Sequence, residues 1–278
     1  LRLTPGIEAH THDYIKTGQI DSKFGFAPVG ETIMNAVKLA LDCENLNLKG
    51  LHCHIGSQIF ETEPYKDAVE IMMNFMKEIK DQTGHIIPEL DLGGGFGIHY
   101  TDEDKPREPK EYCEVILNKV DEVCSRLNME RPILTIEPGR SIVGNAGITL
   151  YTIGAIKNIE GVRTYVSVDG GMTDNIRPAL YGAKYEMAIA NKIDEKANTR
   201  VAIAGKCCES GDIFIEDICI QKPEIGDILA VFSTGAYGFS MSSNYNKNPK
   251  APVVFIKDGV VRLVSKRQSY EELLELEV

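Results

Sequence analysis

Short apolar runs alternate with longer amphipathic segments over the first half of the chain. Strands that are buried on both faces of a parallel sheet are continuous apolar runs, and helices connect them. One amphipathic segment, 62–83, has apolar residues at steps of three and four, with Thr62 placed to cap its start and Gly84 to end it. The pattern predicts repeated β–α units with strands at 1–4, 51–55, 87–92 and 133–136.

The second half of the chain consists of short β-branched runs separated by Gly, Asp and Pro. Such spacing is typical of an antiparallel β domain. Asp258-Gly259 between the last two runs is a hairpin turn signal, and 270–276 is expected to be a short helix. The change of pattern predicts two domains, 1–143 and 144–278, the second with strands at 148–156, 164–168, 201–204, 213–220, 228–232, 253–256 and 260–264.

Composition and charge exclude several classes of protein. With 278 residues, 43% hydrophobic and 26% charged, the chain is an ordinary globular sequence, and it has no apolar run of the roughly 20 residues that a membrane span needs. A net charge of -11 repels the phosphate backbone, so nucleic acid is not an expected partner. Seven cysteines, an odd number without small-domain spacing, indicate reduced thiols in a cytoplasmic protein.

Unusual residues follow three of the four predicted parallel strands: HCHIGS at 52–57, DLGGGFG at 91–97 and EPGR at 137–140. The loops at the carboxyl ends of parallel strands form the binding site in such folds. Glycine lets backbone amides approach an anion, and a hydroxyl adds a donor. The sequence therefore predicts a phosphate cradle, although the glycine run is not the dinucleotide fingerprint. Its candidate residues are Ser57, Gly94, Gly95 and Gly139.

The two histidines of the first of these segments lie on one face of a strand, because side chains alternate along it. A zinc site would need further ligands, and the adjacent Cys207 and Cys208 seldom both reach one metal, so no metal site is predicted. His54, just before Gly56 and Ser57 at a strand end, is favoured as a functional residue.

Taken in order, six segments resemble the diaminopimelate decarboxylases, pyridoxal-phosphate enzymes of the alanine-racemase-like fold group. The likeness extends over 1–271 and implies a (β/α)8 barrel followed by a β domain. It also implies a homodimer with shared active sites. The implied reaction is decarboxylation of meso-2,6-diaminopimelate to L-lysine through an external aldimine with pyridoxal 5'-phosphate. The segments are HIGS, DLGGGFG, EPGR, VDGGMTDNIRPALYGAKY, CCESGD and GAYGFSMSSNYN.

The resemblance assigns cofactor contacts to residues at the strand ends. It implies that His54 stacks on the pyridine ring and that Glu137 pairs with the pyridine nitrogen, because a protonated pyridinium is the better electron sink. It also implies that the four residues of the predicted cradle bind the cofactor's phosphate. Arg140 and Tyr237 match positions that contact both cofactor and substrate.

The resemblance also assigns substrate contacts. Arg140 and Arg177 match carboxylate-binding positions, a task that suits the planar guanidinium, and Tyr181 lies four residues after Arg177. Cys208 matches the thiol that reaches in from the partner subunit to reprotonate the carbanion, and Glu209 matches a carboxylate that contacts the substrate's amino group.

One departure from the family pattern concerns the lysine that holds the cofactor as a Schiff base. The family places it near the start of the barrel in a segment similar to Y-A-x-K-A-N, which this chain lacks; Lys23, in the context SKFG, matches a different stretch. The four predicted strands correspond to the last four of eight, and half a barrel leaves unpaired sheet edges. We expect the amino-terminal part to be missing, and the chain alone to be inactive.

Two alternative functions stay open. A related decarboxylase would act on ornithine, arginine or carboxynorspermidine, but a substrate with a distal amine favours an acidic residue where Arg177 stands. A catalytically inactive relative that binds a partner protein would fit the missing lysine. It would not need to keep Cys208, Glu209, Glu137 and the phosphate cradle together.

Overall fold

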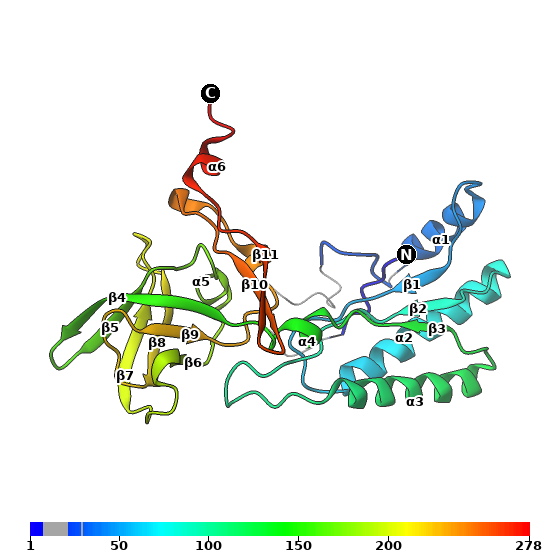
Figure 1. The fold of residues 1–278 in the computed structure, drawn as a ribbon. Coiled ribbons are helices and arrows are strands. Elements are labelled where there is room, and N and C mark those ends of the chain that lie inside the picture. Colours follow the sequence, from blue (N-terminus) through cyan, green and yellow to red (C-terminus); the bar gives the residue numbers. More distant parts are fainter. Residues whose placement is uncertain (8–21, 29) are drawn as a thin grey trace. The chain divides into compact units, whose positions relative to one another are not determined.

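The structure, a computed structural model, describes residues 1–7, 22–28 and 30–278. The chain forms two compact units, Leu1–Ile142 and Val143–Val278 (Figure 1). Each unit has its own set of buried apolar side chains.

The first unit contains a parallel sheet with helices between its strands (Figure 1). Strands β1 (Gly50–His52), β2 (Glu89–Asp91) and β3 (Ile133–Thr135) pair in that order. The run at 1–4 forms parallel bridges instead of a full strand, Arg2 with His52 and Leu3 with Phe26. The expected parallel β–α units are therefore present, and their helices are α1 (Thr32–Asp42), α2 (Glu63–Thr83), α3 (Pro109–Leu127) and α4 (Gly139–Val143).

Helix α2 shows how the sequence pattern becomes packing. Its apolar face is buried, with the side chains of Met72 and Met73 fully inaccessible, as expected for methionine in a core. Gly84 ends the helix with a φ of 74°, a left-handed conformation that glycine adopts without strain. The prediction for Thr62 is wrong in one respect: its backbone is already helical, so its side chain makes no capping hydrogen bond.

The second unit is built on a six-stranded sheet with the order β6-β9-β4-β5-β7-β8. Its neighbouring strands are antiparallel except for β5 and β7, which are parallel. The expectation of a wholly antiparallel domain is wrong at this pair, because the long segment between β5 and β7 allows the chain to cross over. The strands are β4 (Thr149–Ile159), β5 (Arg163–Val168), β6 (Met187–Ile189), β7 (Thr199–Ala204), β8 (Ile213–Ile220) and β9 (Ile228–Val231).

A separate hairpin, β10 (Val253–Lys257) and β11 (Val260–Ser265), follows this sheet. The turn predicted at Asp258-Gly259 is confirmed, since both residues have the positive φ that a two-residue hairpin of this kind requires. The unit also contains α5 (Arg177–Tyr181), α6 (Tyr270–Leu274) and 3-10 turns at Ala190–Lys192, Phe239–Met241 and Tyr245–Lys247.

Two further expectations concern cysteines and membranes. All seven cysteines are unpaired thiols. Among the described residues, none of the helices combines the length and the apolar character that crossing a bilayer would require.

Candidate functional site

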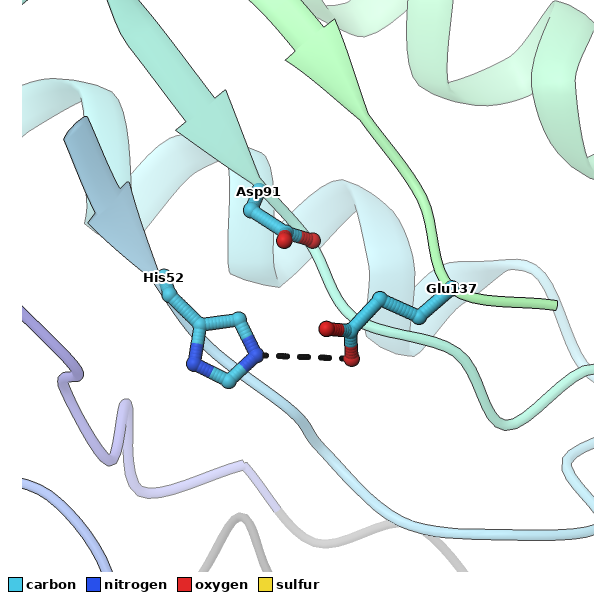
Figure 2. A group of neighbouring side chains, drawn as sticks. All are labelled: His52, Asp91 and Glu137. Atoms are coloured by element: carbon cyan, nitrogen blue, oxygen red, sulfur yellow. Dashed lines mark ion pairs between the residues drawn. The ribbon is translucent and has the colours of Figure 1, made fainter. Parts of the chain in front are cut away.

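The three parallel strands of the first unit bring one side chain each to a common point (Figure 2). His52 ends β1, Asp91 ends β2, and Glu137 follows β3. The His52 Nε2 atom lies 3.6 Å from Glu137 Oε2, and one ligand atom from each of the three residues lies within 4.8 Å of the others. Asp91 Oδ1 accepts the Gly93 N–H at 2.8 Å, so this carboxylate is already occupied in shaping the glycine turn.

His54 lies next to this cluster and is neutral at physiological pH. Burial, followed by the charges of the neighbouring Arg2 and His52, lowers the pKa of His54 to about 4. Its Nδ1 atom accepts a hydrogen bond from the Gly94 N–H at 3.2 Å. A neutral imidazole held in place in this way can face an aromatic ring without adding a charge.

The glycine run allows the strand-end loops to approach backbone to backbone. A Cβ on Gly94 would lie 2.2 Å from the Glu137 carbonyl oxygen, and one on Gly95 would lie 2.3 Å from the Gly56 carbonyl oxygen. The buried Tyr65 hydroxyl donates to the Gly94 carbonyl at 3.0 Å and fixes the same loop. Gly94 and Gly95, two of the four residues predicted as a phosphate cradle, are thus required by packing between the loops as well.

The remaining cradle residues are less tightly packed. Ser57 is half-buried in the loop after β1, and a Cβ on Gly139, at the start of α4, would meet no atom of the described residues within 4 Å. The Ser57 hydroxyl, the neutral His54 imidazole and the Glu137 carboxylate form a donor and acceptor set that fits a phosphorylated pyridine, whereas the Gly94 and Gly139 N–H groups already donate to His54 Nδ1 and to the Glu137 carbonyl.

Arg140 is buried at the strand-end side of the first unit, with 8% of its surface exposed. Its guanidinium donates to the Tyr100 hydroxyl and lies 5.7 Å from the centre of that ring. Tyr100 lies in the polar stretch after the glycine run and outside every recognisable motif, so no sequence signal predicts this contact.

A second buried arginine occupies the second unit. Arg177 and Tyr181 are the first and last residues of α5, and Arg177 is 8% exposed. The Arg177 guanidinium donates to the hydroxyl of Tyr185, the last residue of the VDGGMTDNIRPALYGAKY segment, for which the sequence predicts no role. Buried arginines usually need partners for their five N–H donors, and the tyrosine four residues after Tyr181 is a signal that could have been used.

The CCESGD segment places its two cysteines in different environments. Cys208 is exposed, whereas Cys207 is partly buried. Burial, and then the charge of Asp212, raises the pKa of the Cys207 thiol to about 11. Glu209 accepts the Tyr245 hydroxyl at Oε1, while its Oε2 atom is shielded from solvent and has no hydrogen-bond partner among the described residues.

Tyr237 has a φ of 58°, in the left-handed region that bulky residues seldom adopt, and 46% of its surface is exposed. Such backbone strain is often retained at functional sites. The predicted residues are thus divided between the units. His54, Ser57, Gly94, Gly95, Glu137, Gly139 and Arg140 lie in the first, and Arg177, Tyr181, Cys208, Glu209 and Tyr237 in the second.

Comparison with known proteins gives consistent matches. Residues 1–144 match the family model described as pyridoxal-dependent decarboxylase, pyridoxal binding domain. Over all 278 residues the chain is 53% identical to the diaminopimelate decarboxylase of Bacillus subtilis (strain 168) and 51% identical to that of Halalkalibacterium halodurans. In both comparisons the whole chain is covered but only 63% of the relative, so the chain spans less than two thirds of these relatives' length.

Solved structures of diaminopimelate decarboxylases match the fold of this chain over its whole length. The diaminopimelate decarboxylase from M. jannaschii superimposes with a TM-score of 0.90 at 36% identity, covering all of this chain and 62% of that one. The enzyme from Helicobacter pylori, an I148L mutant complexed with L-lysine, gives a TM-score of 0.89 at 31% identity and covers all of this chain and 66% of that one.

Proposed function

The chain belongs to the family of pyridoxal-dependent decarboxylases, and from this premise we propose that the protein decarboxylates meso-2,6-diaminopimelate to L-lysine and carbon dioxide. The observation that carries the proposal is the 53% identity to a diaminopimelate decarboxylase along the whole chain. We further propose that the first unit provides the last four strands of a (β/α)8 barrel that holds pyridoxal 5'-phosphate.

The strand-end residues of the first unit would hold the cofactor. Bound pyridoxal phosphate supplies an electron sink for the carbon that loses carbon dioxide. Glu137 would keep a proton on the pyridine nitrogen, with His52 at 3.6 Å steadying the carboxylate. The neutral His54 would stack on the ring, and Ser57 with Gly94, Gly95 and Gly139 would bind the phosphate.

The second unit, together with Arg140 of the first, would recognise the substrate, and the second unit would return the proton. A substrate with a carboxylate at each end calls for cationic donors, and the buried Arg177 and Arg140 suit that task, with Tyr181 and Tyr237 beside the substrate. The Glu209 Oε2 atom, which lacks a hydrogen-bond partner among the residues that the structure describes, would accept a hydrogen bond from the substrate's ammonium group. The Cys208 Sγ atom would then deliver a proton to the carbon that lost carbon dioxide.

We also propose a homodimer in which Cys208 and Glu209 of one subunit act on the cofactor held by the other. A related substrate such as ornithine is disfavoured, because a distal amine would face the Arg177 guanidinium.

The direct test uses the holoenzyme, expressed from the whole gene that encodes this chain. We expect release of carbon dioxide and formation of L-lysine from meso-diaminopimelate, and a strong loss of both in the variant Cys208→Ala. If the enzyme binds the cofactor but releases no carbon dioxide from diaminopimelate, its substrate is a related amino acid. An enzyme that binds no pyridoxal phosphate would contradict the proposal.

A further inference from the structure

The loop that carries Cys208 and Glu209 is folded around the carboxylate of Asp212. This side chain is buried, with 4% of its surface exposed. Its Oδ1 atom accepts the Met172 N–H at 2.6 Å, and its Oδ2 atom accepts the Cys207 N–H at 2.7 Å. Charge-assisted bonds from two backbone donors tie this loop to the segment just after β5.

Backbone hydrogen bonds close the same loop. It connects the end of β7 to the start of β8. The Gly205 N–H donates to the Asp212 carbonyl at 2.8 Å, and the Asp212 N–H donates to the Glu209 carbonyl at 2.9 Å. Asp212 therefore stands at the base of a short closed turn, with Cys208 and Glu209 presented beyond it.

Two glycines provide the space for this carboxylate. A Cβ on Gly171 would lie 2.4 Å from Asp212 Oδ2, and one on Gly205 would lie 2.2 Å from the same atom. Neither glycine is among the residues with positive φ, so backbone conformation does not require glycine at these positions. The buried Asp212 carboxylate, which leaves no space for a Cβ, explains why both positions are glycine.

The arrangement also separates the two adjacent cysteines. The Cys207 N–H is bound by Asp212, and burial together with the Asp212 charge raises the pKa of the Cys207 thiol to about 11. Cys208, one residue later, is exposed. One carboxylate thus holds one thiol inward and protonated while the other is presented outward.

We propose that Asp212 is a positioning residue whose carboxylate places Cys208 for proton delivery and Glu209 for ammonium recognition, an inference that rests on the proposed function. Asp212 itself does not act on the substrate; it acts through the turn that it holds together.

The test compares the holoenzyme with Asp212→Asn. Asparagine keeps the size of the side chain but replaces one accepting oxygen by an NH2 group, which then faces a backbone N–H. We expect kcat to fall by about 10- to 100-fold, the loss typical of a misplaced reacting group, and KM to rise because Glu209 is displaced with Cys208, while the absorbance of the bound cofactor changes little.

A second measurement compares the alkylation rates of the two cysteines and does not require catalytic turnover. Cys207 and Cys208 are alkylated with iodoacetamide at pH 8, and each rate is measured by mass spectrometry of the peptides. Removing the Asp212 charge lowers the pKa of Cys207, so its alkylation becomes faster, about tenfold for each unit by which the pKa falls. A role confined to overall stability would not change the ratio of the two rates.

A second variant and two controls guard against misfolding. Gly205→Ala displaces the same carboxylate by a different route, so we expect it also to lower kcat. Asp217→Asn, at an exposed pair with Arg200, and Gly154→Ala, whose Cβ would meet only the Ser167 carbonyl at 4.0 Å, should behave as the wild type.

Wild-type kcat and a wild-type ratio of alkylation rates in Asp212→Asn would overturn the proposal. If that variant does not fold, unchanged kcat and alkylation in Gly205→Ala would overturn it equally. Failure of the proposed function appears separately, as a wild-type enzyme that releases no carbon dioxide from diaminopimelate. The alkylation ratio would then still decide whether Asp212 places the loop.

Discussion

Burial sets the protonation state of His54, and this has a measurable consequence. The pKa of His54 in the folded chain is about 4, whereas an unperturbed histidine has a pKa of 6.5. Between these values the unfolded chain binds more protons than the folded one, so the free energy of unfolding falls as the pH decreases through this window.

We expect NMR titration of the His54 ring protons to give a midpoint near pH 4. In His54→Gln the decrease of the unfolding free energy between about pH 6.5 and 4 should be smaller than in the wild type, since this residue then contributes nothing to it. Identical curves for the two proteins would contradict the low pKa.

The close approach of the strand-end loops makes Gly94 sensitive to any side chain. In Gly94→Ala the new methyl group would meet the Glu137 carbonyl, which is backbone and yields little. We expect a loss of about 1–3 kcal/mol in unfolding free energy, measured by urea denaturation. Gly139→Ala, which adds a methyl group to open space, serves as the stability control and should change this free energy little.

In the proposed function, the choice of substrate depends on Arg177. We expect Arg177→Ala to lower kcat/KM for diaminopimelate by about 100-fold, the equivalent of one or two lost charge-assisted hydrogen bonds. The affinity for pyridoxal phosphate should change much less. Arg200→Ala, at an exposed pair with Asp217, is the matched control, and equal activity of the two variants would remove the argument for a distal carboxylate.

At the scale of elements, α2 gives the clearest link from pattern to stability. Met72 is fully buried on its apolar face. Met72→Ala should lower the unfolding free energy by about 2–5 kcal/mol, because it removes buried methylene groups and leaves a cavity. Lys77→Ala, on the exposed face of the same helix, loses only an ion pair with Asp81 and should cost less than about 0.5 kcal/mol. Chemical denaturation distinguishes the two costs.

Elements with a strong periodic pattern could be predicted, and those defined by distant partners could not. The strand at Ile213–Ile220 and the end of α2 at Gly84 follow from local residues. Strand β6, Met187–Ile189, is three residues long and exists because it pairs with β9, far along the chain. No local pattern specifies that partner, and the same holds for the parallel pairing of β5 with β7.

At the scale of the whole molecule, the proposed shared active site predicts complementation between two inactive variants. Glu137→Gln changes a residue of the proposed cofactor site, and Cys208→Ala removes the proposed proton donor. If these residues act together from different subunits, mixed dimers contain one intact site, and a mixture of the variants should recover about a quarter of the wild-type activity. Carbon dioxide release after unfolding and refolding the mixture provides the measurement; recovery no greater than the sum of the separate variants would contradict a shared site.

The sequence by itself determined that a half with parallel β–α units precedes a β-rich half. It also determined the hairpin turn at Asp258-Gly259 and the likeness to a decarboxylase family. Hydrophobic period and turn residues act over a few positions, and family motifs are short strings, so both can be read locally. Only the tertiary structure decided that His52 lies against Glu137, that Tyr100 and Tyr185 bind the two buried arginines, and that Asp212 holds the loop of Cys208. These contacts depend on strand pairing and loop closure, which bring together residues that share no local pattern.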